Sequence, residues 1–191
     1  LDFFATLFSS ARTMLPLVAD QILGMGAGGY GLLTTADAIG SLIAGLLVSL
    51  RRDIYRQGTV LLGSVALYGV FTVLFGLSGT FAASYLFFAL IGASDTVSTI
   101  IRQTLRQTLT PDRLRGRMTG INQIFFMGGP QLGELEAGMV AAAFGVPFAI
   151  ISGGIATVAL TGYIAWRYPR LRRYNSATMA EESAAVAAAG T

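Results

Sequence analysis

Long apolar stretches separated by short polar connections set the hydropathy pattern of this chain. A helix that crosses the hydrocarbon core of a bilayer needs about 20 consecutive, mostly apolar residues. The stretches that meet this length are Phe3–Leu23, Tyr30–Leu50, Gly58–Leu77, Phe81–Ile101, Thr119–Phe144 and Pro147–Trp166. The pattern therefore predicts an all-α membrane protein, with a bundle of six transmembrane helices within residues 1–174.

The composition agrees with a lipid environment. Charged residues make up 12% of the chain and hydrophobic residues 53%, whereas soluble domains contain about 25% charged residues. A soluble domain of 191 residues could not bury that much apolar surface in one core, so the lipid bilayer is the expected partner. The segment 175–191 is alanine-rich and has no apolar stripe, which predicts a disordered cytoplasmic tail.

The basic residues lie on one side of the predicted membrane. All 13 are arginine, and all but Arg12 fall in three clusters that follow the second, fourth and sixth predicted helices. Basic residues in short loops mark the cytoplasmic side, so we expect a multi-pass protein of the inner or plasma membrane with both ends in the cytoplasm. The chain enters an apolar helix directly after Leu1, and we expect this start to be internal to a longer polypeptide.

Six acidic or basic side chains fall inside the predicted helices. They are Arg12, Asp20, which is near the outer end of the first helix, Asp37, Asp95, Glu134 and Glu136. Each costs about 2.5–3.5 kcal/mol near the bilayer centre, so such residues usually face a cavity or a partner. The third and sixth predicted helices carry none. We therefore expect the first, second, fourth and fifth helices to border water or substrate, and the third and sixth to form an outer wall. The alternatives are interfacial snorkelling or helix capping for Asp20 and Asp95 and a structural ion pair for Arg12 and Glu134.

Helical spacing adds detail to the fourth predicted helix. Asp95, Ser98, Arg102 and Arg106 fall on one stripe that leads from membrane depth to the cytoplasmic end.

The fifth predicted helix combines carboxylates with a weak point. Gln131 and Glu134 share roughly one face, whereas Glu136 points about 200° away from Glu134. One glutamate is thus expected to line a cavity and the other to pair with a neighbouring helix. The adjacent Gly129 and Pro130 predict close helix packing, a hinge beside the carboxylates, or both.

Missing residue types exclude several chemistries. The chain has no cysteine and no histidine, which removes thiolate nucleophiles, the usual general base and the commonest transition-metal ligand. It has no lysine and hence no Walker A motif. We therefore predict no enzymatic activity, no cofactor and no metal. The arginine clusters flank membrane helices, so orientation and anionic lipid explain them better than nucleic acid does.

Two motifs fail on their context. Gly24, Gly26 and Gly29 match G-x-G-x-x-G, but a dinucleotide site needs a preceding strand, and these glycines lie in a turn between two predicted helices. Asp37 and Asp95 would have to meet to form an aspartate dyad, and we expect them towards opposite faces of the membrane. Neither motif supports an enzyme.

Several segments resemble one transporter family. Ile101–Gln107 (IRQTLRQ), followed by Thr110–Arg117 (TPDRLRGR), resembles the central cytoplasmic loop in the C-terminal half of major facilitator superfamily exporters. The narrower likeness is to the branch that contains the bacterial enterobactin exporter. Other segments that resemble this branch are Leu132–Gly138, Leu1–Thr6 and Tyr168–Arg172.

This resemblance implies that the six helices correspond to helices seven to twelve of a twelve-helix transporter, so that an N-terminal six-helix half is the missing partner. It implies secondary active export of a small organic molecule such as a siderophore or drug. Our leading hypothesis is proton coupling through Glu134, with Glu136, Asp37 and Asp95 as weaker candidates. Arg12 would be the partner of Glu134 or would bind an anionic substrate group. The alternative is a non-transporting membrane fragment, scaffold or channel subunit.

Charged residues of the cytoplasmic connections are expected to orient the protein and to form gate contacts. The gating motif of the superfamily is matched only in part, by Gly45 and the later Arg51, Arg52 and Asp53. Ser49 stands where the aspartate of the motif is expected. The candidate gate and orientation residues are Arg51, Arg52, Asp53, Arg102, Arg106, Asp112, Arg113, Arg115 and Arg117.

Overall fold

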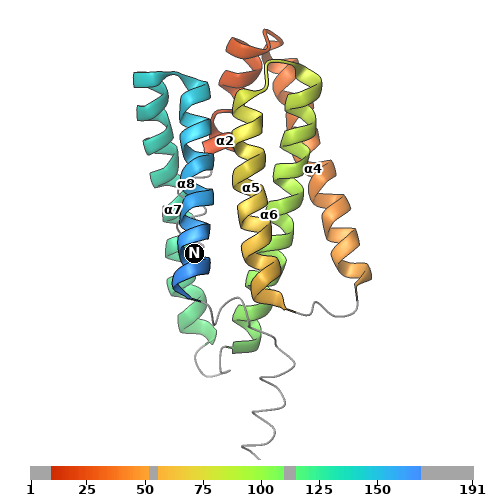
Figure 1. Ribbon diagram of the computed structural model, residues 1–191, viewed down its shortest axis with the longest axis vertical. Helices are drawn as coiled ribbons and strands as arrows, with labels where there is room; N and C mark the ends of the chain where they lie inside the picture. The colour runs from red at the N-terminus through yellow and green to blue at the C-terminus, as the bar shows by residue number, and fades with distance from the viewer. Residues whose placement is uncertain (1–9, 52–55, 110–114, 169–191) are drawn as a thin grey trace, which may run out of the picture.

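The computed structural model describes residues 10–51, 56–109 and 115–168, and these ranges are almost entirely helical (Figure 1). The elements in chain order are α2 (Ser10–Thr13), α3 (Leu15–Leu17), the π-helix η1 (Val18–Ile22), α4 (Gly26–Leu50), α5 (Gln57–Leu77), α6 (Phe81–Leu109), α7 (Arg115–Phe144) and α8 (Val146–Arg167). No strand occurs within these ranges. The predicted all-helical class is confirmed for this part of the chain, and the predicted tail at 175–191 lies outside it.

Four of the described helices are long and apolar enough to cross a bilayer. The qualifying segments are Gly26–Leu50, Gln57–Leu77, Phe81–Gln107 and Val146–Arg167, which match the second, third, fourth and sixth predicted spans. α7 has 30 residues, roughly 45 Å at 1.5 Å per residue, but its charged, amide and glycine residues make it less apolar. Six spanning helices therefore stay a prediction.

The first predicted helix is broken in its described part. Pro16 lies in the first turn of α3, where its ring and its missing N–H interrupt the helix that would otherwise continue from α2. Beyond it, the N–H of Leu23 donates to the carbonyl of Val18 at 3.0 Å, the wider spacing of a π-helix. Residues 10–22 are therefore helical in three segments, α2, α3 and η1, and not as one continuous α-helix, whereas the membrane span over Phe3–Leu23 stays a prediction.

The connection predicted between Arg102 and Met118 is mostly helix. α6 continues eight residues beyond Ile101 to Leu109, and α7 begins at Arg115. Ile101 is buried and packs with Leu105 against Leu61 and Val65 of α5. Because these apolar residues keep a helical spacing, the helix continues past the point where the long apolar run ends.

The long helices are arranged side by side, with α6 packed along both α4 and α5, and α5 packed along α8 (Figure 1). Glycine allows the close approach of α5 and α8. A Cβ atom on Gly154 would lie only 2.8 Å from the carbonyl oxygen of Gly69 and 2.9 Å from the backbone nitrogen of Val73. Small residues at such a crossing are typical of membrane helix pairs.

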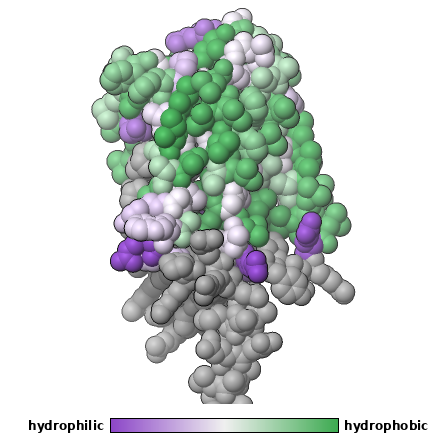
Figure 2. All heavy atoms as spheres, in the orientation of Figure 1, coloured by the Kyte–Doolittle hydropathy of each residue, from purple (hydrophilic) through white to green (hydrophobic). Residues whose placement is uncertain are grey.

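The long apolar helices differ in how far they are buried within the chain. Within its apolar window, α5 has 44% of its residues buried, compared with 22% for α4. α5, which was expected in the outer wall, is covered from two sides because it lies between α6 and α8. The face that carries α4, α5 and α6 is apolar over most of its height, and polar residues gather mainly at its two ends (Figure 2).

Candidate functional site

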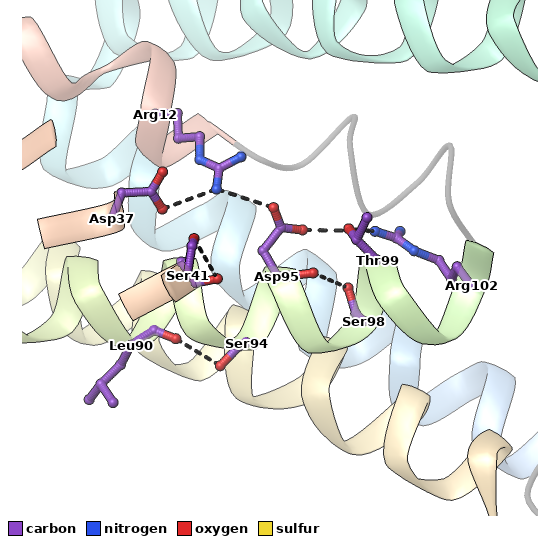
Figure 3. Close-up of polar contacts among 10 residues, drawn as sticks. Arg12, Asp37, Ser41, Leu90, Ser94, Asp95, Ser98, Thr99 and Arg102 are labelled. Atoms are coloured by element: carbon purple, nitrogen blue, oxygen red, sulfur yellow. Dashed lines mark hydrogen bonds and ion pairs between the residues drawn. The ribbon is translucent and has the colours of Figure 1, made fainter. Parts of the chain in front are cut away.

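Arg12 of α2 holds two carboxylates from two different helices (Figure 3). Its Nη2 atom lies 3.0 Å from Oδ1 of Asp37 in α4 and 3.1 Å from Oδ2 of Asp95 in α6. One guanidinium therefore connects three elements that are far apart in the sequence. We call Arg12, Asp37, Asp95 and Arg102 the ion-pair cluster.

The meeting of Asp37 and Asp95 corrects the expectation that they lie towards opposite faces of the membrane. α4 and α6 are separated by α5 in the sequence and run in the same direction (Figure 1). Asp37 follows the first residue of α4 by 11 positions, and Asp95 follows the first residue of α6 by 14. At 1.5 Å per residue both carboxylates lie roughly 16–21 Å from the same end.

A close approach of α4 and α6 fixes the position of Asp37. A Cβ atom on Gly92 of α6 would collide with Oδ1 and with the backbone carbonyl of Asp37. One turn further along α4, the hydroxyl of Ser41 donates to the carbonyl oxygen of Gly92 at 3.2 Å. Gly40 meets the backbone of Ala89 in the same way. The carboxylate is thus held against a backbone, which restricts its movement.

Asp95 has a second basic neighbour. Nη2 of Arg102 lies 3.8 Å from Oδ1 of Asp95 and donates to Oγ1 of Thr99 at 2.9 Å (Figure 3). Nε of Arg106 donates to the carbonyl of Arg102 at 3.3 Å. The stripe predicted on this helix is therefore a connected series of charges that begins at Asp95 and continues towards the end of α6.

The cluster is partly open to its surroundings. The side chain of Arg12 is 44% exposed, and those of Asp37 and Asp95 are 25% and 31% exposed. Arg102 is more covered, at 12%. With two arginines and two aspartates the cluster is neutral when all four are ionised. Such compensation reduces the cost of placing charges within a membrane segment.

The carboxylates of α7 lie apart from this cluster. Gln131 and Glu134 are exposed, and Glu136 is half-buried. Among the described residues neither glutamate forms an ion pair, and the ion pairs of Arg12 go to Asp37 and Asp95. The expected pairing of Arg12 with Glu134 is therefore not present, because Asp37 of α4 and Asp95 of α6 occupy the guanidinium instead.

The predicted gate residues are only partly described. Arg51 is exposed at the end of α4, and Arg106 is half-buried near the end of α6. Arg52, Asp53, Asp112 and Arg113 lie outside the described residues, as do the side chains of Arg115 and Arg117.

Sequence reasoning missed three residues that shape the site. Thr99 lies four residues after Asp95, on the same stripe, and its position could have been found from that spacing. Gly92 and Ser41 gave no such signal, because their role depends on which helices are neighbours. In the described ranges no group of three or more acidic side chains could hold a metal ion.

Comparisons with known proteins give the family context of this site. A family model described as transmembrane secretion effector, of the major facilitator superfamily, matches residues 2–188. The enterobactin exporter of Salmonella choleraesuis (strain SC-B67) is 30% identical over 149 residues, which is 78% of this chain and 36% of that protein. The enterobactin exporter of Escherichia coli O127:H6 is 31% identical over 118 residues, 61% of this chain and 28% of that protein. The chain thus spans about a third of the length of these curated relatives. No solved structure matches it.

Proposed function

This chain belongs to the transmembrane secretion effector family of the major facilitator superfamily, and we propose that it is the C-terminal six-helix half of a proton-coupled exporter. In this proposal both ends lie in the cytoplasm and an N-terminal half completes the substrate cavity. Its cargo is a small organic molecule such as a siderophore or drug. The relatives named as exporters of enterobactin support this class of cargo, and the positions of the arginine clusters support the orientation.

One observation carries the coupling proposal: a single guanidinium is shared by two carboxylates at similar depth. While Asp37 and Asp95 are both ionised, they hold Arg12 between α4 and α6. A proton taken up by Asp95 removes one of the two attractions, so Arg12 remains with Asp37. The link from α2 to α6 is then weakened while the link from α2 to α4 persists. Proton binding can thereby change which helices move together.

This arrangement suits an antiport cycle. With access to the outside, a proton binds Asp95 and its link to Arg12 weakens. With access to the cytoplasm, the proton is released, the ion pair forms again, and cargo is exchanged for the proton. Arg12 is 44% exposed, so an anionic group of the cargo could also take the place of a carboxylate. Glu134 remains a second candidate for proton binding because it is exposed on α7.

The test is export by the full-length parent protein, reconstituted in vesicles with an imposed pH gradient. Asp95→Asn should abolish the part of export that depends on the gradient, and Asp37→Asn should reduce it. Asp20→Asn is the matched control, because Asp20 is exposed in η1 and belongs to no ion pair of the described residues. Gradient-dependent export that survives Asp95→Asn but is lost in Glu134→Gln would move the coupling site to α7. Absence of any flux from the unmodified parent would favour the non-transporting alternative.

A further inference from the structure

A second site lies on the bundle, away from the ion-pair cluster. It is an open groove of about 780 Å³ bordered by α4, α5 and α6. The groove has walls that include Leu47 and Val48 of α4, Leu67 of α5 and Val97 of α6, and Arg51 stands at its end. It is distinct from the cluster, because Ser94 lines the groove and the next residue, Asp95, projects about 100° around the helix towards Arg12 (Figure 3).

The groove exists because of how three helices pack. α6 contacts both α4 and α5 along their lengths, and it forms the floor between them. Gly63 of α5 contributes no side chain to the wall, and a Cβ atom there would meet nothing within 4 Å. Leu47 and Leu67 leave 61% and 51% of their surface open. An occupant therefore has access from the side of the bundle.

The lining is apolar even at its two serines. The hydroxyl of Ser64 donates to the carbonyl of Val60 at 2.8 Å, and the hydroxyl of Ser94 donates to the carbonyl of Leu90 at 2.8 Å. Each serine hydroxyl thus donates its hydrogen bond within its own helix. Apart from Arg51, the remaining wall consists of alkyl groups and the ring of Phe71, which favour an apolar chain over a polar ligand.

One end of the groove carries positive charge. Arg51 caps the C-terminal end of α4 and is exposed, and Arg56 precedes α5. A guanidinium matches the geometry of a phosphate group. The basic end lies in a connection where the membrane helices stop, and anionic lipid headgroups gather at that depth of a cytoplasmic leaflet. The site therefore combines an apolar channel with an anion-binding end.

We propose that this groove binds a membrane glycerophospholipid, with an acyl chain between α4 and α5 and an anionic headgroup phosphate on Arg51. The alternation of chemistry along the groove, apolar for its length and cationic at one end, is complementary to such a lipid. A helix of a partner protein would fit the apolar walls but would leave the arginine without an anion. The proposal rests on the membrane location of α4–α6 and on the proposed cytoplasmic side of the arginine-rich ends, but not on the coupling role of the ion-pair cluster.

The test is lipid binding by the full-length protein in detergent, after removal of endogenous lipid, measured by native mass spectrometry. The probes are phosphatidylglycerol and phosphatidylcholine with identical acyl chains. The unmodified protein should bind phosphatidylglycerol more tightly. Arg51→Gln should weaken that binding about tenfold and remove the preference between the two lipids. Arg167→Gln is the matched control, because Arg167 ends α8 outside the groove and should leave the preference unchanged.

Filling the groove provides an independent arm. Gly63→Leu projects into open space and should lower the number of tightly bound lipids by one for both probes. Ile155→Leu on α8, at a position that is 56% exposed and outside the groove, should not change that number. Unfolding temperatures within the range of the unmodified protein would show that both variants fold. The proposal would be overturned if Arg51→Gln and Gly63→Leu both bound lipid as the unmodified protein does. Loss of a co-purifying protein from Gly63→Leu, with lipid binding unchanged, would assign the groove to a partner helix instead.

Discussion

Asp37 and Asp95 bind the same nitrogen atom, Nη2 of Arg12, at 3.0 and 3.1 Å. This relationship makes the first helical segment dependent on α4 and α6 together. It also means that neither aspartate can be changed without altering the environment of the other, because the two carboxylates share one counter-charge.

Removal of Arg12 should destabilise the bundle more than removal of either aspartate. Arg12→Gln leaves two neighbouring carboxylates without their shared counter-charge. A fully buried pair broken in this way costs about 3–5 kcal/mol, and the 44% exposure of Arg12 reduces our expectation to about 1–3 kcal/mol. The measurement is denaturant unfolding in detergent. The triple variant Arg12→Gln, Asp37→Asn, Asp95→Asn should recover part of the stability that Arg12→Gln loses. A loss in the triple variant that equals the sum of the three single losses would contradict the shared ion pair.

Gly92→Ala should separate α4 from α6 at the position of Asp37. The added methyl group would collide with the side chain and the backbone of Asp37, so one helix must shift, at a cost of about 1–3 kcal/mol. Gly63→Ala is the matched control, since a Cβ there meets nothing within 4 Å. That control should be stabilising by up to about 1 kcal/mol, from helix propensity alone. Thermal unfolding of both variants gives the comparison, and similar values would contradict the close approach.

Gly154→Ala should weaken the contact between α5 and α8. The new Cβ would lie 2.8 Å from the carbonyl of Gly69, which is backbone and cannot rotate away. We expect a loss of about 1–3 kcal/mol, measured by thermal unfolding. Gly162→Ala, in the same helix with nothing within 4 Å of its Cβ, should show no loss. A stable Gly154→Ala protein would require a different crossing of α5 and α8.

The orientation of the bundle can be tested with single cysteines, because the chain has none of its own. Gly79→Cys lies in the connection between α5 and α6, and Tyr168→Cys follows the last helix. If the arginine-rich ends are cytoplasmic, a membrane-impermeant maleimide added to intact cells should label Cys at position 79 only. Labelling at position 168 before permeabilisation would reverse the proposed topology.

The ends of three long helices could be predicted from the sequence alone, and the end of a fourth could not. The boundaries of α4, α5 and α8 fall within a few residues of the apolar runs Tyr30–Leu50, Gly58–Leu77 and Pro147–Trp166, because burial in lipid or protein requires an apolar surface all round such helices. The end of α6 was placed eight residues too early. Beyond Ile101 the helix is amphipathic, so its continuation depends on packing against α5.

The candidate site was predicted in part. The stripe from Asp95 through Arg102 to Arg106 follows from spacing within one helix, and the contact of Arg102 with Asp95 lies on that stripe. The partner of Arg12 was expected to be Glu134 and is instead the pair Asp37 and Asp95. Helical spacing orders residues within one helix and carries no information about which helices become neighbours, so this error could not be corrected from the sequence.

Local sequence is sufficient to identify an all-helical membrane protein, to show which of its long helices carry charged residues, and to show which residue types are absent. These properties follow from local composition and from the fixed 3.6-residue period of the α-helix. The packing of the helices, by contrast, is needed to see that Gly92 lets α4 and α6 meet at Asp37, and that Arg12 of α2 reaches both aspartates. Those contacts join residues 25 or more positions apart, and they depend on steric fit between backbones that no local pattern records.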